Sequence, residues 1–279
     1  MNKKKIDPES SPWAPFGIQL RKFREAKDLL QEELAPLLEC SASHLSYIEL
    51  AHRPPSRKLA ELADIVLDTG GTMMLMWYQL KNAAILEGFP ECARYEGLAE
   101  TIRIFENDYI TGLLQTRAYM AALQSGYVRQ GFVSQKLADE RIAFRLARQQ
   151  VLDRTPPPLI HAILDESCLR RVIGGRDVMI EQLLHLEQLA TRPNIVIQIA
   201  PFSLGENRVF AHMQHLLTMP NRRILAYGEV ELRGYIDRDS KSVDALTKQY
   251  DRLAVEAYGQ AESLTFMRAT RRDLEWTST

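Results

Sequence analysis

The sequence has few cysteines, no long apolar run and no excess of either charge, and each absence excludes a class of protein. Its 3 cysteines, Cys40, Cys92 and Cys168, form an odd set without metal-like spacing, which indicates reduced thiols and a cytoplasmic protein. No run of about 18 apolar residues is present, so we expect no membrane span. The basic N-terminus lacks the apolar segment of a secretory signal.

The charges are nearly balanced, with 35 Lys and Arg against 36 Asp and Glu. Residues 1–60 contain ten Lys or Arg and eight Asp or Glu, a net charge of about +2. Any surface for nucleic acid therefore depends on a small patch, and its affinity should be modest and sensitive to salt. The length of 279 residues suits one large or two ordinary domains, and we find no internal repeat.

The chain divides into two regions with different residue patterns. Residues 16–88 carry five short helical patterns, which predict a compact all-α domain after a flexible arm at residues 1–15. Residues 89–279 mix helical patterns with alternating, β-branched segments at short spacing. We therefore predict an α+β protein, in which a five-helix domain precedes a domain with a sheet covered by helices.

Residues 29–50 have the hydrophobic pattern of a helix-turn-helix. Ser41 is suited to cap the second helix, which we place at residues 41–50. Apolar or small residues occupy the inward and crossing positions, namely Leu34, Ala35, Leu38, Leu45 and Ile48.

This segment resembles the Xre/Cro-type helix-turn-helix family. The resemblance is carried by Arg24, Gln31, Glu33, Leu34, Ala35, Ser41, Leu45, Ile48 and Glu49. It implies a five-helix domain that sets residues 41–50 in the major groove of double-stranded DNA. It also implies that Gln31 contacts a backbone phosphate and that Arg24 and Glu49 form a structural salt bridge.

Several positions depart from the family pattern. Pro36 lies inside the first helix, where a missing N–H costs about 3 kcal/mol. Glu39 and Ala51 stand where the family often has glycine, because those positions tend to need positive φ. Leu30 replaces the usual polar cap, so we expect the domain to fold with less than ideal stability.

The outward face of the second helix lacks arginine. Relatives commonly carry arginine or glutamine where Ala42 and Tyr47 stand, and arginine to guanine is the commonest strong base contact. We therefore predict binding led by phosphate contacts, with modest base discrimination. The predicted DNA-binding residues are Gln31, Ser41, Ala42, Ser43, His44, Ser46, Tyr47, Arg53, Arg57 and Lys58.

The second part resembles the C-terminal domain that follows an Xre-type helix-turn-helix in a large bacterial family of antitoxin-like regulators. Matching stretches include TGLLQTRAYMAAL and VMIEQLLHLEQLATRPNIVIQIAPFSLG, within residues 98–268. The resemblance implies a transcription factor, often paired with a small protein partner encoded nearby. It implies no established reaction.

No constellation of side chains indicates catalysis, so we expect no enzyme, cofactor or metal. His212 and His215 lie three apart on a predicted strand, so they face opposite sides and we interpret them as surface or edge residues. Asp165 and Glu166 suit a turn and a helix start better than an active site. We interpret Arg141, Arg145 and Arg148 as a solvated face, Cys168 as buried, and Met73, Met74, Met76 and Trp77 as interdomain core.

Three hypotheses follow. The first is a regulator that binds an inverted repeat as a homodimer, with the second domain supplying dimerisation and a ligand or partner surface. The alternative is an antitoxin-like interaction protein, in which a degenerate helix-turn-helix has lost DNA reading and the chain sequesters a small protein. The third, an enzyme working through Asp165, Glu166 or the histidines, has no reaction to support it.

Overall fold

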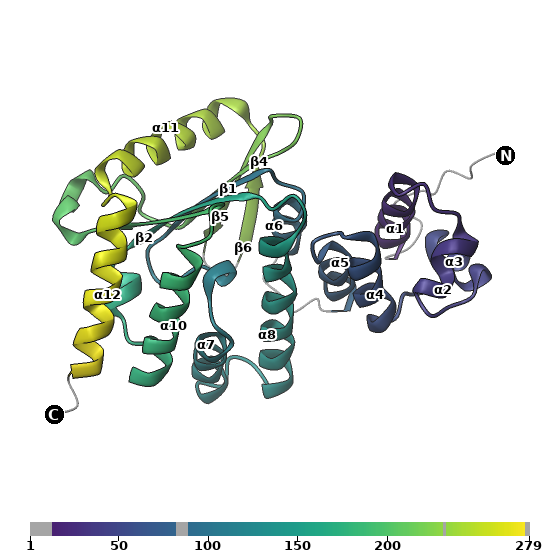
Figure 1. Ribbon diagram of the computed structural model, residues 1–279, viewed down its shortest axis with the longest axis horizontal. Helices are drawn as coiled ribbons and strands as arrows, with labels where there is room; N and C mark the ends of the chain where they lie inside the picture. Colours follow the sequence, from purple (N-terminus) through teal and green to yellow (C-terminus); the bar gives the residue numbers. More distant parts are fainter. Residues whose placement is uncertain (1–12, 82–88, 231–232, 277–279) are drawn as a thin grey trace.

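The computed structural model describes residues 13–81, 89–230 and 233–276. Positions 1–12 of the predicted arm lie outside the described residues, and Ala14 and Pro15 already belong to the first helix. Figure 1 shows an N-terminal helical lobe beside a larger lobe that contains a sheet. The N-terminal helices are α1 (Ala14–Ala26), α2 (Gln31–Leu37), α3 (Ala42–Glu49), α4 (Arg57–Leu67) and α5 (Thr72–Lys81).

Local signals explain where these helices begin and end. Ser56 caps α4, because its hydroxyl accepts a hydrogen bond from the N–H of Leu59 at 3.1 Å. The helix ends at Asp68, which has a left-handed φ of 52°. The buried carboxylate of Asp64 accepts from the N–H groups of Met73 and Met74 at 2.7 and 2.8 Å, so α4 supplies the cap for α5.

The second lobe contains one mixed six-stranded sheet, which confirms the predicted α+β class. The strand order is β3-β2-β1-β4-β5-β6. The first three strands are mutually parallel, whereas β4, β5 and β6 run antiparallel to their neighbours. The strands are β1 (Thr101–Glu106), β2 (Leu159–Asp165), β3 (Ile195–Ala200), β4 (Gln214–Thr218), β5 (Ile224–Val230) and β6 (Arg233–Asp237).

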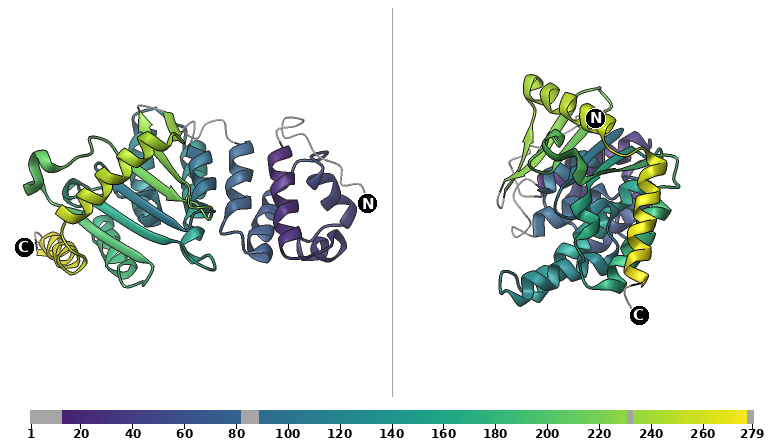
Figure 2. Two further views of the ribbon diagram at one scale, coloured as in Figure 1. Left: turned by 90° about the horizontal axis from the view of Figure 1, so that it is seen from above. Right: turned by 90° about the vertical axis from the view of Figure 1, so that its left-hand side faces the viewer.

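Helices cover both faces of this sheet, because alternate strand residues are apolar on both sides. On one face, Phe105, Ile163 and Leu216 form a core with α11 (Ser240–Glu256). On the other, Ile102, Ile104 and the isoleucines of β3 pack under the remaining helices (Figures 1 and 2). These are α6 (Phe89–Glu96), α7 (Arg117–Arg129), α8 (Gln135–Gln149), α9 (Glu166–Arg170), α10 (Arg176–Leu189) and α12 (Gln260–Trp276).

The two lobes share a continuous hydrophobic core. Met73, Met74 and Met76 of α5 belong to the same buried cluster as Phe144 and Ala147 of α8, which confirms the predicted interdomain role of the methionines. Gly71 is required at this seam. Its φ is +83°, and a Cβ there would lie 2.6 Å from the carbonyl oxygen of Ala147.

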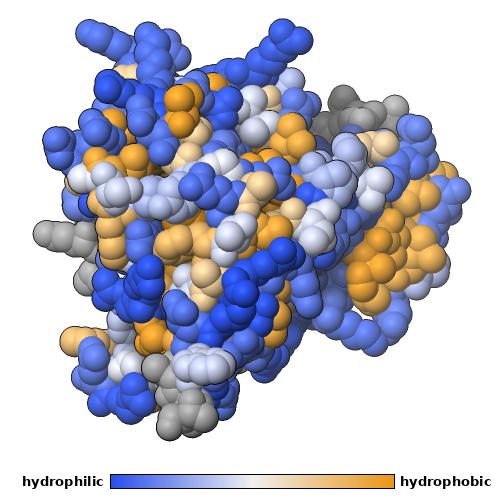
Figure 3. All heavy atoms as spheres, turned by 60° about the vertical axis from the view of Figure 1, so that its left-hand side comes forward, coloured by the Kyte–Doolittle hydropathy of each residue, from blue (hydrophilic) through white to orange (hydrophobic). Residues whose placement is uncertain are grey.

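The outer surface mixes polar and apolar side chains. Figure 3 shows hydrophobic patches scattered among hydrophilic residues on the side of the second lobe. Among the helices that the structure describes, none is long and apolar enough to cross a membrane.

Candidate nucleic-acid interface

The helix-turn-helix is built on a small buried core. Leu34, Leu38, Leu45 and Ile48 are almost completely buried between α2 and α3. Gly17 of α1 allows the close approach of α3, because a Cβ at this position would lie 2.4 Å from the carbonyl oxygen of Ile48. This glycine belongs to the scaffold of the site, and the helix-turn-helix pattern from residue 29 onward does not include it.

The departures from the family pattern are absorbed at helix ends. Pro36 is the penultimate residue of α2, so the N–H that it lacks affects only the last turn. Glu39 and Ala51 follow α2 and α3 with φ values of 52° and 59°. A residue with a Cβ costs roughly 1 kcal/mol in this left-handed conformation, so both positions reduce the stability of the domain.

A buried ion pair joins α1 to α3. Arg24 donates from Nε to Oε1 of Glu49 at 2.6 Å and from Nη2 to Oε2 at 2.9 Å. Its third nitrogen donates to the carbonyl oxygen of Leu29 at 2.7 Å, just before α2. The hydrogen bond with Glu49 raises the pKa of Arg24 and holds the guanidinium charged. Arg24 therefore fixes the start of α2 relative to α3.

Gln31 extends this pair toward the surface. Its amide nitrogen donates to Oε2 of Glu49 at 2.7 Å, so the side chain is already oriented in the protein without DNA. The remaining amide hydrogen is available to a phosphate at the start of α2. The predicted phosphate contact of Gln31 stays a prediction, and the ion pair gives it a physical support.

The predicted recognition residues share one end of the molecule. Ser41 caps α3 by accepting from the N–H of His44 at 3.2 Å. Ser43 and Tyr47 are exposed, whereas Ala42, His44 and Ser46 are half-buried. In Figure 1, α3 lies at the end of the N-terminal lobe that is farthest from the sheet. Within the part of the chain that the structure describes, this end is open to a large ligand.

Two grooves run along α3, one on each side. The first has a volume of about 590 Å³ and lies between α3 and the start of α4. The second has about 760 Å³ and lies between α3, α1 and the start of α2. Ser43 and Tyr47 line both grooves, so they form the ridge between them.

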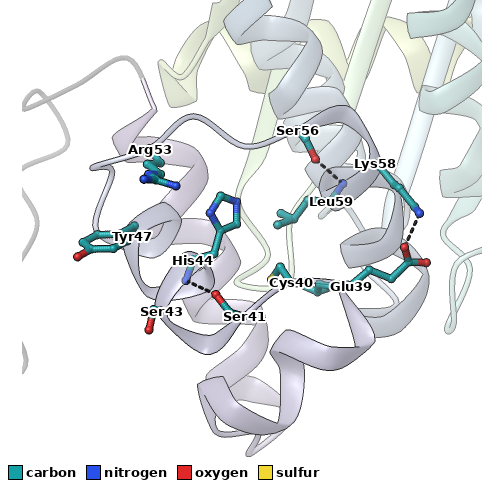
Figure 4. Close-up of a pocket in the computed structure, with 11 residues that line it drawn as sticks. Glu39, Cys40, Ser41, Ser43, His44, Tyr47, Arg53, Ser56, Lys58 and Leu59 are labelled. Atoms are coloured by element: carbon teal, nitrogen blue, oxygen red, sulfur yellow. Dashed lines mark hydrogen bonds and ion pairs between the residues drawn. The ribbon is translucent and has the colours of Figure 1, made fainter.

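Positive groups stand at both grooves. Figure 4 shows Arg53 near Tyr47 on one side of the first groove and Lys58 on the other. The Arg53 guanidinium lies 5.7 Å from the centre of the Tyr47 ring, and Lys58 forms an exposed ion pair with Glu39. Arg57 is exposed at the first position of α4 but does not line the groove. Arg21 also lines the second groove, although it is not among the residues predicted from the sequence to bind DNA.

The second lobe contains a buried charge network, and two of its members, Arg148 and His215, were predicted from the sequence to lie at the surface. Arg148 is 2% exposed and binds both carboxylate oxygens of Glu96, at 2.5 and 2.7 Å. His215 is 1% exposed and lies 3.3 Å from a carboxylate oxygen of Glu96 and 3.3 Å from one of Glu106. The interpretation of Arg148 as solvated and of His215 as a surface residue is wrong, because α6 and the sheet cover them.

The network carries opposed charges that stabilise each other. Burial by itself would lower the pKa of His215, but Glu106 and Glu96 outweigh burial and raise it. Burial would likewise raise the pKa of Glu96, but Arg148 and His215 hold it below its ordinary value. Cys92, Glu96 and His215 could ligate a metal by distance alone, within 4.8 Å of one another. Arg148 occupies both oxygens of Glu96, so these three residues do not fit a cation.

The remaining candidates have structural roles. The Asp165 side chain caps α9 by accepting from the N–H of Ser167 at 2.9 Å, as a helix-start role predicts. Glu166 accepts from the N–H of Phe202 at 2.9 Å. Cys168 is buried as expected, and His212 is exposed.

Comparison with known families assigns both parts of the chain. A family model described as "Domain of unknown function (DUF5753)" matches residues 89–269. A model described as "Helix-turn-helix domain" matches residues 15–74. No curated protein and no solved structure matches the chain. The helix-turn-helix match indicates DNA binding by the lobe that presents α3 and its two grooves.

Proposed function

The chain belongs to the DUF5753 family, and from its helix-turn-helix domain we propose that it is a transcriptional regulator that binds double-stranded DNA sequence-specifically. The observation that carries the proposal is the ridge of Ser43 and Tyr47 between two grooves, at the open end of the molecule. An α-helix with a groove on each side has the shape that the major groove of DNA accepts.

The proposed docking places α3 in the major groove. Ser43 contacts a base edge, and the small side chain of Ala42 contacts a thymine methyl group. Gln31 and Arg53 contact phosphates on opposite sides of α3, because each lines a different groove. Since no arginine reaches a base from α3, phosphate contacts supply most of the affinity.

The second domain completes the regulator in this proposal. It acts by binding and not by catalysis, and it brings two copies together on an inverted repeat whose half-sites lie about 34–36 Å apart. An Xre-type, antitoxin-like regulator of this kind would work in the bacterial cytoplasm, with a small protein partner encoded nearby. A dimer also raises base discrimination, because two modest half-sites must then be matched together.

Fluorescence anisotropy of the full chain tests this proposal. The chain is titrated onto labelled DNA from its own upstream region and onto scrambled DNA, at two salt concentrations. We expect a preference for its own DNA that persists at the higher salt, whereas purely electrostatic binding would disappear equally for both.

A pair of tyrosine variants connects the binding to α3. Tyr47 and Tyr235 are 48% and 49% exposed, and Tyr235 lies on β6. Tyr47→Ala should weaken binding to the upstream DNA by about 5-fold or more, and Tyr235→Ala should leave it within about twofold. If the upstream and scrambled DNA bind equally in the anisotropy experiment, and both lose binding at the higher salt, the alternative of an interaction protein that sequesters a partner is favoured instead.

A further inference from the structure

A small cavity lies beside α6, outside the DNA-binding lobe. Its volume is about 300 Å³, at the lower end of the range for small-molecule sites. Its apolar lining comes from Tyr95 of α6, Met219 and Pro220 of the β4–β5 turn, and Leu225 of β5. Leu225 is buried, so this part of the lining belongs to the core and does not depend on a mobile side chain.

The rim of this cavity is positively charged. Arg223 and Arg238 line it, and Arg94, which does not line it, lies near, with its guanidinium 4.3 Å from the centre of the Tyr95 ring. Arg238 has Glu91 as a partner at 2.6 Å. Within residues 13–81, 89–230 and 233–276, neither Arg223 nor Arg94 forms an ion pair with a carboxylate. The arginines also lower the pKa of Tyr95, mainly through the hydrogen bond from Arg238.

We propose that this cavity binds a small amphipathic anion, with an apolar body on Leu225 and Met219 and one carboxylate or phosphate group at Arg223. An anion gains a charge-assisted hydrogen bond with Arg223 that an uncharged apolar ligand cannot form, and a cation would be repelled. A compact ligand fits the volume, and a charge-assisted hydrogen bond to Arg223 orients it.

The position of the cavity suits an effector site, which is the part of this inference that rests on the proposed function. Three residues within one turn of α6 contact three different parts of the protein. Ala93 is buried in the core of the DNA-binding lobe, Tyr95 walls the cavity, and Glu96 holds Arg148 of α8. A ligand that moves Tyr95 therefore moves the helix on which the DNA-binding lobe packs.

Isothermal titration of the full chain with two defined probes tests the site itself. The probes are octanoate and phenyl phosphate, and octan-1-ol and octylamine are the neutral and cationic analogues. We expect octanoate, phenyl phosphate or both to bind saturably, with a dissociation constant of about 0.1 to 1 mM. Binding of one anion alone identifies the preferred head group. The site is overturned if neither anion binds, or if octan-1-ol and octylamine bind as tightly as the anions.

A matched pair of arginine variants locates the binding. Arg223→Gln should weaken the bound anion about 5-fold. Arg222→Gln removes the same charge from the neighbouring turn position, which does not line the cavity, and should change the affinity less than twofold. Equal weakening by both variants would show a diffuse charge effect and would overturn the assignment to the cavity. Circular dichroism of both variants checks that they are folded.

Coupling to DNA is measured separately. With saturating anion, the dissociation constant for the upstream DNA should change at least about 3-fold, and DNA should change the affinity for the anion by the same factor. Anion binding without this change overturns the effector role and leaves the site intact. Absence of any DNA binding overturns the proposed function, while the titration with octanoate still decides the site.

Discussion

Each lobe contains a buried arginine–glutamate pair, and the two pairs differ in what surrounds them. In the DNA-binding lobe, Arg24 binds Glu49, and the pair is completed by Gln31 and a backbone carbonyl. In the second lobe, Arg148 binds Glu96, and the pair is completed by His215. The first pair reaches the surface through Gln31, whereas the second is closed on every side by α6, α8 and the sheet.

The difference shows how context sets the cost of a buried charge. The Arg24 side chain is 9% exposed and keeps a backbone acceptor, so solvent and Leu29 can compensate for a lost partner. The Arg148 and His215 side chains are 2% and 1% exposed; Arg148 depends on Glu96, and His215 depends on Glu96 and Glu106. A buried ion that loses its partner is strongly destabilising, whereas a partly solvated one is less so. Identical substitutions in the two pairs should therefore have unequal effects.

The largest effect is expected for Glu96→Gln, which keeps the shape and removes the charge. Arg148 loses its counter-ion and His215 keeps only Glu106, so the free energy of unfolding should fall by about 4 kcal/mol. Urea unfolding followed by circular dichroism measures the change. A loss below about 1 kcal/mol would show that Arg148 and His215 find other compensation, and the comparison between the lobes would fail.

A third buried carboxylate, Asp64, caps α5 and extends the comparison to pH. Among the described residues it forms no ion pair with an arginine. Burial raises the pKa of Asp64 to about 6, whereas arginine and histidine lower the pKa of Glu96. Because the folded pKa of Asp64 exceeds its ordinary value of 3.8, the folded state holds this proton more tightly than the unfolded state. Stability from this group is therefore complete below about pH 3.8 and falls as the pH rises through 6.

The measurement is the unfolding free energy of the natural chain relative to Asp64→Asn, between pH 4 and 7. A difference of about two pKa units corresponds to about 3 kcal/mol, so the natural chain should lose about that much relative to the variant. A gap that stays constant with pH would mean that the hydrogen bonds from Met73 and Met74 cancel the effect of burial.

Glu49→Gln should have a smaller effect than its counterpart at position 96. Only one cation loses its partner, and that cation keeps its bond to Leu29, so we expect a loss of about 2 kcal/mol. The same urea experiment compares the two variants directly. If Glu49→Gln costs as much as Glu96→Gln, the degree of solvation is not what separates the two pairs.

The smallest change in stability is expected for Gln31→Leu. The lost hydrogen bond to Glu49 is partly buried and contributes about 1 kcal/mol. Affinity for the upstream DNA should fall about 5-fold, because the phosphate contact is lost. Gln135→Leu is the control, since Gln135 also occupies the first position of its helix and bonds an acidic side chain, Asp139, at 2.8 Å. Equal effects of both on DNA binding would exclude a phosphate contact by Gln31.

Much of the fold follows from local patterns. The period of apolar residues predicts α1 to α5, and the alternating, β-branched segments of residues 89–279 predict the sheet, because these signals depend on neighbouring residues. The short helix α6 is not predicted, and of α9 only the start at Asp165 and Glu166 is, because its 5 residues are too few for a clear period. The positive φ at Glu39 and Ala51 follows from the family resemblance, and the structure has both.

The surroundings of the arginines are what the sequence predicts least well. Arg141, Arg145 and Arg148 repeat along one side of α8, which is typical of a solvated face, yet Arg148 is buried against Glu96. Arg21 lines the groove beside α3, but nothing in its own neighbourhood marks it as part of the site. The spacing shows that these side chains share a face and does not show what covers that face.

Helix periods, strand alternation and N-caps are interactions within a few residues, so the amino-acid order alone specifies where these elements run and that α3 presents its polar side outward. The buried network and the cavity beside α6 depend on packing. Glu96 meets Arg148 and His215 across 52 and 119 residues of chain, and the sheet that brings them together is assembled from distant strands. Burial of a charge depends on its neighbours in space, and these are established only when the chain has folded.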